Sequence, residues 1–194
     1  MGRRLGRKRL YSLQKEGQSI SGSSGGGVTG SIGDISVSRQ GSELVTEIYV
    51  DLGSSKGALY QPGTANLIIG YSSSTDGVQD AGNAQLLRVT PAEHGHITTA
   101  ELICLEEPEG GDRRINLSRK ASVAAFSGSV AADVIVGGNL TLGSASSAVF
   151  DDDALNMQYL YLTYGAATDS ADATQYTAGK VLVRLYGWAV PDDL

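Results

Sequence analysis

The sequence feature that most constrains this chain is a run of alternating residues near its end, from Tyr176 to Val190. The run is rich in β-branched, aromatic and aliphatic residues and contains no proline. Its period of two is typical of a strand with one buried face. One set of side chains is expected to face the core: Val181, Val183, Leu185 and Ala189. The other set is expected to face outward: Lys180, Leu182, Arg184, Tyr186 and Trp188. Such a strand needs neighbours on both edges and a second layer over its apolar face.

Several upstream segments have similar patterns and are predicted as further strands. They are residues 34–38, 43–52, 65–71, 84–90, 97–106, 114–117, 121–127, 133–136, 139–142 and 157–164. Pro91 is expected to end one strand, residues 107–112 to form a turn, and Gly137-Gly138 to form a two-residue hairpin turn. The sequence contains no convincing helix and no internal repeat. It therefore predicts an all-β fold, an antiparallel β-sandwich, with a jelly roll as the expected subtype.

The length and the glycine distribution predict one folded domain preceded by an arm. The 194 residues are enough to bury one core. Residues 17–27 form a Gly/Ser-rich tether. We therefore expect residues 1–27 to be an extended basic arm with its tether, and residues 28–194 to be the sandwich domain. Cys104 is the single cysteine, which excludes an internal disulfide, and it is predicted to be a small buried hydrophobe.

Neither a membrane span nor a signal peptide is predicted. No apolar run approaches about 18 residues. The basic start of the chain is not followed by an apolar segment of signal-peptide length. We expect a soluble protein made in a reducing cytoplasm, with no membrane partner.

Charge is distributed unevenly along the chain. The net charge is −6, but residues 1–16 hold six basic residues and one acidic residue, a net charge of +5. Nine basic and twenty acidic residues remain for the rest, a net charge of −11. Apolar residues interrupt the charges of the arm, so it differs from a simple solvated polybasic tail. The arm is predicted to bind a partner through Arg3, Arg4, Leu5, Arg7, Lys8, Arg9, Leu10, Tyr11 and Leu13.

No catalytic, cofactor or metal site is predicted. His94 and His96 flank Gly95 and could hold a metal ion if Glu93 joined them, but an exposed polar loop is the favoured interpretation. The carboxylates of residues 151–153 could bind calcium, but they lack the alternate spacing of a calcium loop, which favours a charged turn that caps a helix. Walker and nucleophile-elbow motifs are absent from the sequence. The chain is therefore not expected to be an enzyme.

Three function classes remain open. The first is a structural building block of a large assembly. The second is a nucleic-acid-binding module that uses the basic arm as an electrostatic contact. The third is a small-ligand or carbohydrate-binding sandwich, although the aromatic platforms that bind sugars are scarce, at 6% aromatic residues. The net charge of −11 on the body would repel phosphate everywhere except at the arm, which makes a nucleic-acid partner the weaker expectation.

Three stretches carry a resemblance to a known group of proteins. They are MGRRLGRKRLYSL at residues 1–13, VTEIYVDLGSSKG at residues 45–57 and DDDALNMQYLYLT at residues 151–163. They resemble small virion structural proteins of marine cyanophage-type tailed phages, and the likeness runs over most of the chain. The resemblance rests on the general order of residues in these stretches and not on a catalytic motif. It therefore assigns no functional role to any residue of this chain.

The resemblance implies a capsid-associated or decoration (cement) role in a bacteriophage virion assembled in the host cytoplasm. The expected partners are the major capsid protein or other virion proteins. A shell-forming protein of tailed phages is usually longer and mixed α/β, which favours the accessory role. Outward apolar residues on the last strand predict a homo-oligomer, for which a trimer is our expectation.

Overall fold

The computed structural model describes residues 34–54, 58–70, 84–124, 134–150, 154–165 and 174–189. The predicted arm and tether, residues 1–27, lie outside this part of the chain. Within it, ten strands and one helical turn follow one another: β1 (Ile35–Gln40), β2 (Glu43–Asp51), β3 (Tyr60–Gln61), α3 (Pro91–His94), β4 (His96–Glu109), β5 (Arg114–Lys120), β6 (Val134–Asn139), β7 (Ala145–Val149), β8 (Tyr159–Tyr164), β9 (Thr174–Gln175) and β10 (Ala178–Trp188).

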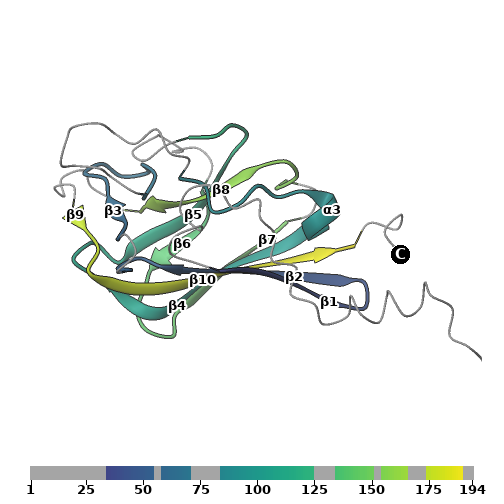
Figure 1. Cartoon of the computed structure of the whole chain (residues 1–194), viewed down its shortest axis with the longest axis horizontal. Coiled ribbons are helices and arrows are strands. Elements are labelled where there is room, and N and C mark those ends of the chain that lie inside the picture. Colours follow the sequence, from purple (N-terminus) through teal and green to yellow (C-terminus); the bar gives the residue numbers. More distant parts are fainter. Residues whose placement is uncertain are drawn as a thin grey trace, which may run out of the picture.

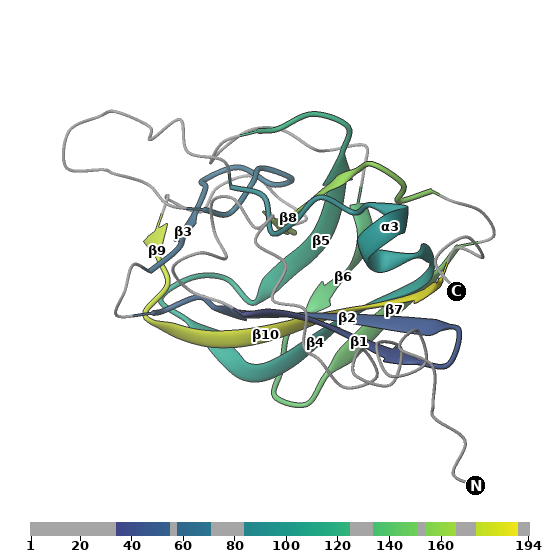
Figure 2. The same cartoon turned by 45° about the vertical axis from the view of Figure 1, so that its right-hand side comes forward.

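The strands form two layers with a small sheet at one end. A five-stranded sheet has the order β1-β2-β10-β4-β7, and a three-stranded sheet has the order β6-β5-β8. Strands β3 and β9 pair separately, and the strand pairs of all three sheets are antiparallel. Figures 1 and 2 show β5, β6 and β8 stacked over the large sheet. The predicted all-β antiparallel sandwich is confirmed, while the jelly-roll subtype stays a prediction.

Strand β10 lies at the centre of the large sheet, as its alternating pattern indicates. It pairs with β2 on one edge and with β4 on the other. Val181, Val183 and Leu185 are fully buried, which confirms the predicted inner face. Ala189 was assigned to the same face, but it lies just past the strand end and is half-buried, and Gly187 holds the last buried position. The core continues into the second layer through Ile115, Leu117, Leu160 and Leu162.

Two segments predicted as strands cover the free edge of β8 without forming regular strands. Residues 65–70 and 84–90 make only isolated bridges, such as those from Ile68 to Thr163 and from Arg88 to Tyr159. Their backbones nevertheless bond to β8, for example from Leu86 N to Leu160 O at 2.7 Å. Residues 84–90 bond to the first half of β8 and residues 65–70 to its second half. Each segment therefore pairs with too few residues of β8 to form a regular ladder. Four of their backbone N–H groups, those of Asn66, Ile69, Leu86 and Val89, donate to carbonyls of β8 or of Gln158 just before it.

Pro91 was expected to end a strand, but it is the first residue of the helical turn α3. It occupies the first turn of α3, where its missing N–H is not needed for a helical bond. Gly95 closes the turn with a φ of 70° and donates its N–H to the carbonyl of Pro91 at 2.9 Å. The prediction of no helix is therefore wrong by this one short turn.

The predicted hairpin at Gly137-Gly138 is also wrong. Strand β6 runs straight through both glycines and pairs with β5. A Cβ atom on Gly137 would lie 1.8 Å from Asn116 Oδ1 on β5, so glycine is required here for close approach rather than for a turn. The chain turns later, at Gly143 with a φ of 77°, and enters β7 in place of the strand predicted at residues 139–142.

We expect Gly137→Ala to lower the free energy of unfolding by about 1–3 kcal/mol, because the new methyl group overlaps the Asn116 side chain. Adding Asn116→Ala should restore part of that loss by removing the amide. Gly138→Ala is the matched control, since its Cβ would meet only Ser146 Oγ at 3.0 Å. Urea unfolding of Gly137→Ala, Asn116→Ala, the double variant and Gly138→Ala measures both effects, and strictly additive losses for Gly137→Ala and Asn116→Ala would contradict this account.

Strands β4 and β5 are longer than predicted. Strand β4 continues through the expected turn at residues 107–112 as far as Glu109, with Pro108 buried. A register shift in the β10–β4 ladder lies between Ala178 and Lys180, opposite this proline, and such bulges tolerate a residue that cannot donate to the ladder. Strand β5 ends at Lys120 instead of residue 117, and residues 121–124 are not a strand.

Candidate interaction surface

The partner-binding residues predicted in the arm, from Arg3 to Leu13, lie outside the described residues, as do the carboxylates of residues 151–153. The structure therefore places neither set. Among the described residues it places the predicted histidine pair, the single cysteine and the outward side chains of the large sheet.

The two histidines of the predicted pair lie in different environments. His94 is the last residue of α3 and is 3% exposed, whereas His96 begins β4 and is exposed. His94 Nδ1 lies 3.1 Å from Thr90 N and 3.2 Å from Thr90 O, so it accepts from the first or donates to the second according to its tautomer. The expectation of an exposed polar loop is wrong for His94, because α3 packs against β2 and β10. The described part of the chain holds no group of three or more His, Cys, Asp or Glu side chains arranged to bind a metal ion.

Burial of His94 predicts that stability decreases in mild acid. Desolvation lowers the pKa of His94 below its ordinary value of about 6.5. The unfolded chain therefore binds the proton more readily than the folded chain, and the free energy of unfolding should fall as the pH drops below about 6.5. Urea unfolding between neutral and mildly acidic pH measures this slope. His94→Gln should flatten the curve and His96→Gln should not, and an unchanged slope in His94→Gln would contradict the assignment.

Cys104 is a free, buried residue on the inner face of β4, as predicted. Its burial raises the pKa of the thiol, which keeps it in the unreactive protonated form at neutral pH.

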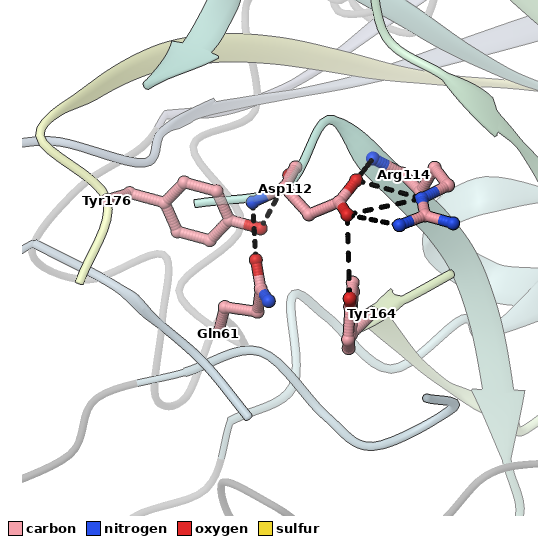
Figure 3. A network of polar contacts seen from close by, with 5 residues as sticks. All are labelled: Gln61, Asp112, Arg114, Tyr164 and Tyr176. Carbon is pink, nitrogen blue, oxygen red and sulfur yellow. Dashed lines mark hydrogen bonds and ion pairs between the residues drawn. The ribbon is translucent and has the colours of Figure 1, made fainter. Parts of the chain in front are cut away.

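A polar network of five residues fixes the turn between β4 and β5 (Figure 3). Asp112 accepts bonds from Arg114 N at 2.8 Å and from Arg114 Nε at 3.0 Å, and the Tyr164 hydroxyl donates to it at 3.5 Å. The Asp112 N–H donates to Gln61 Oε1, and the Tyr176 hydroxyl donates to the Asp112 carbonyl at 3.2 Å.

The electrostatics of this network suit a structural role. Hydrogen bonds from Arg114 hold the pKa of Asp112 below its usual range, so its carboxylate stays ionised and paired. Burial raises the pKa of Tyr176, whose side chain is fully buried. A Cβ atom on Gly111 would lie 2.5 Å from the Tyr176 ring, so glycine lets the turn close over the ring. An arginine-paired carboxylate is a poor general base, and the network joins β3, β5, β8 and the segment before β10.

The outward side of the large sheet is the broadest surface that the described strands form. Side chains of neighbouring strands lie in rows across it, because the ladders place them in register. Apolar rows alternate with charged rows, about 7 Å apart along the strands. The apolar rows are Val45–Tyr186–Thr99 and Tyr49–Leu182–Ile103, in which the hydroxyls of Thr99 and of the two tyrosines are the polar groups. The charged rows are Glu47–Arg184–Glu101 and Asp51–Lys180–Glu106. We call this surface the outer face; it also includes Glu43 and Trp188 at one end.

The outer face is acidic despite its ion pairs. Arg184 donates to Glu47 Oε1 through Nη2 at 2.7 Å and Nε at 2.9 Å, and its Nη1 lies 3.8 Å from Glu101 Oε2. Lys180 pairs with Glu106. The outer face carries two basic side chains, Lys180 and Arg184, and five carboxylates, an excess of three negative charges. The carboxylates are those of Glu43, Glu47, Asp51, Glu101 and Glu106.

The sequence pattern predicted which residues of β10 point outward, but not which residues of β2 and β4 lie beside them on the outer face. The alternation within β2 and β10 assigns each residue to a face, but which carboxylate lies opposite which base depends on the register between strands. Registers such as Arg184 opposite both Glu47 and Glu101 have no signature within a single strand.

No helix among the described residues is long and apolar enough to cross a membrane. Comparison with known proteins finds no matching family model, no matching curated protein and no matching solved structure.

Proposed function

We propose that the chain is a non-enzymatic virion structural protein, a decoration or cement protein that docks on a phage capsid through its N-terminal arm and through contacts between copies. The resemblance of residues 1–13, 45–57 and 151–163 to cyanophage-type virion proteins motivates the class. The observation that carries the docking role is the division of charge, +5 in residues 1–16 and −11 in the remainder.

The composition of the arm favours a protein partner over nucleic acid. Charge pairs are screened beyond about 8 Å at physiological salt, and an exposed pair contributes only about 0–1 kcal/mol. The interleaved apolar residues would each contribute roughly 1.5–3 kcal/mol if fully buried, and would then carry most of the affinity. The partner is therefore an acidic surface with apolar recesses, on the major capsid protein or on another virion protein. The proposed state of the free protein is a homo-oligomer, with a trimer as the specific hypothesis.

Two arm variants test this function in particle-incorporation assays. In the first, Leu5, Leu10 and Leu13 are changed to Ser; in the second, Arg3, Arg4, Arg7, Lys8 and Arg9 are changed to Gln. We expect the leucine variant to lose particle binding at least as severely as the charge variant, because apolar burial supplies most of the affinity.

A nucleic-acid arm makes the opposite prediction. Its affinity would fall steeply with salt, and its leucines would contribute little. If the leucine variant joins particles normally while the charge variant does not, and the wild type binds DNA, the docking role is wrong.

A further inference from the structure

The outer face complements the arm of the same chain in charge and, like the arm, combines apolar with charged side chains. We propose that residues 1–16 dock on the outer face of their own sandwich domain while the protein is free, and leave it when they bind a virion partner. The docked arm would cover the outward residues of β10, so contacts between copies of the free protein would form on other surfaces. This inference rests on the proposed role of the arm as a docking segment, and it adds a second, internal acceptor for that segment.

Charge is the first element of this complementarity. The arm carries +5, and the outer face has three more carboxylates than basic side chains. Arg184 gives both of its short bonds to Glu47. Glu101 is left with a 3.8 Å ion pair and the Tyr186 hydroxyl, which donates to it at 3.1 Å. A further guanidinium would therefore find Glu101 only partly neutralised.

The alternation of apolar and charged positions is the second element. Arginine and leucine interleave along residues 3–13 of the arm, and apolar and charged rows alternate across the outer face. Trp188 is the most exposed aromatic residue of that face, at 52%, and it lies beside Glu43. An indole next to a carboxylate can receive either a leucine side chain or an arginine, through apolar contact or a cation–π interaction.

The point where the chain enters the sheet makes its own outer face reachable. The carbonyl of Asp34, the first described residue, accepts from Tyr49 N at 2.9 Å, which places it beside a row of the outer face. Residues 17–33 separate the arm from this point and would span roughly 23 Å as a flexible chain. The five-stranded sheet is only about 19 Å wide.

Tethering favours the domain to which the arm is attached over a neighbouring copy. A short flexible linker presents the arm to its own domain at an effective concentration in the millimolar range. In purified protein at micromolar concentration, the outer faces of other molecules are present only at that micromolar concentration. To bind the arm, a virion partner must therefore displace it from the outer face of the chain to which the arm belongs. Internal docking should thus weaken binding of the arm to that partner.

The single tryptophan, Trp188, reports directly on occupancy of the outer face. Acrylamide quenching of its fluorescence is measured in the full chain at low salt and at about 1 M NaCl, where the Debye length falls to about 3 Å. We expect Trp188 to be more protected in the wild type at low salt than at high salt, and more protected than in the five-residue Arg/Lys→Gln variant. The protection should be independent of protein concentration.

A matched pair of charge reversals locates the contact. Glu101→Lys alters the outer face, whereas Glu93→Lys makes the same change of net charge on α3, where Glu93 is exposed. Quenching in Glu101→Lys should match the arm variant, and quenching in Glu93→Lys should match the wild type. Thermal melting of each variant checks that the sandwich is intact, and the arm variant gives the same comparison without altering the sheet.

Each alternative has its own result. Equal quenching in the wild type and in the arm variant would overturn the proposal, and protection that grows with protein concentration would assign the arm to a neighbouring copy instead. Particle incorporation separates this inference from the proposed function. Glu101→Lys should join particles at least as well as the wild type, because its arm is released. A wild type that never joins particles would refute the proposed function while leaving the fluorescence result unaffected.

Discussion

Replacing Val183 with Asp should abolish soluble expression of the folded protein. Val183 is fully buried at the middle of β10, between Ile48 of β2 and Leu102 of β4. A carboxylate there would have only apolar neighbours from both strands, and burying an unpaired polar or charged group costs several kcal/mol. The total stability of a domain of this size is only about 5–15 kcal/mol, so this single change removes a large share of it.

The neighbouring position provides the control for Val183→Asp. Leu182 points to the outer face, where an Asp side chain would remain hydrated, so Leu182→Asp should yield a soluble protein that melts cooperatively. Expression yield, circular dichroism and thermal melting compare the two variants. A soluble, cooperatively melting Val183→Asp protein would show that the faces of β10 have been assigned the wrong way round.

A second large loss of stability is expected at the junction between α3 and β4. Gly95 has a φ of 70° and a ψ of −169°, a region that is essentially restricted to glycine. A Cβ atom at this position would lie 2.3 Å from the carbonyl oxygen of Trp188, a backbone atom that cannot move without disturbing the end of β10. Gly95→Ala should therefore lower the free energy of unfolding by about 3 kcal/mol or more, from backbone strain and overpacking together.

Gly41 supplies the matched control for that substitution. It also has a positive φ, 65°, but an added Cβ would meet nothing within 4 Å. Gly41→Ala should therefore show only the conformational penalty of about 1 kcal/mol. Chemical denaturation of both variants separates the penalty due to φ from the penalty due to the clash. Equal losses in the two proteins would contradict the role assigned to the contact with β10.

Local pattern was sufficient for the strands that bury one face. Residues of β2 and β10 alternate strictly, so their bounds and inner faces could be predicted within a few residues. Strand β7 has the sequence ASSAV, whose small side chains give no strong alternation, and it was not predicted. Its position follows from pairing with β4 and not from any preference of its own residues.

The predictions failed at residues whose role depends on a contact with a residue far away in the sequence. Gly137-Gly138 has the composition of a hairpin turn, and only the position of Asn116 on another strand reveals that the glycines make room for a side chain. The Asp112 network has the same character, because Gln61, Tyr164 and Tyr176 reach it from other parts of the chain. Such contacts depend on tertiary register, which a single sequence does not display.

The central position of β10 has a consequence for when this protein can fold. It is the last of the described strands, yet it joins β2 to β4, so a nascent chain that has not yet emerged as far as Trp188 lacks the strand between them. Until then the backbone groups of β2 and β4 that pair with β10 lack these bonds, and pairing β2 with β10 must close a loop of more than a hundred residues. Folding of the large sheet should therefore wait until β10 has been synthesised, and chains truncated before β10 should aggregate instead of forming a partial sandwich.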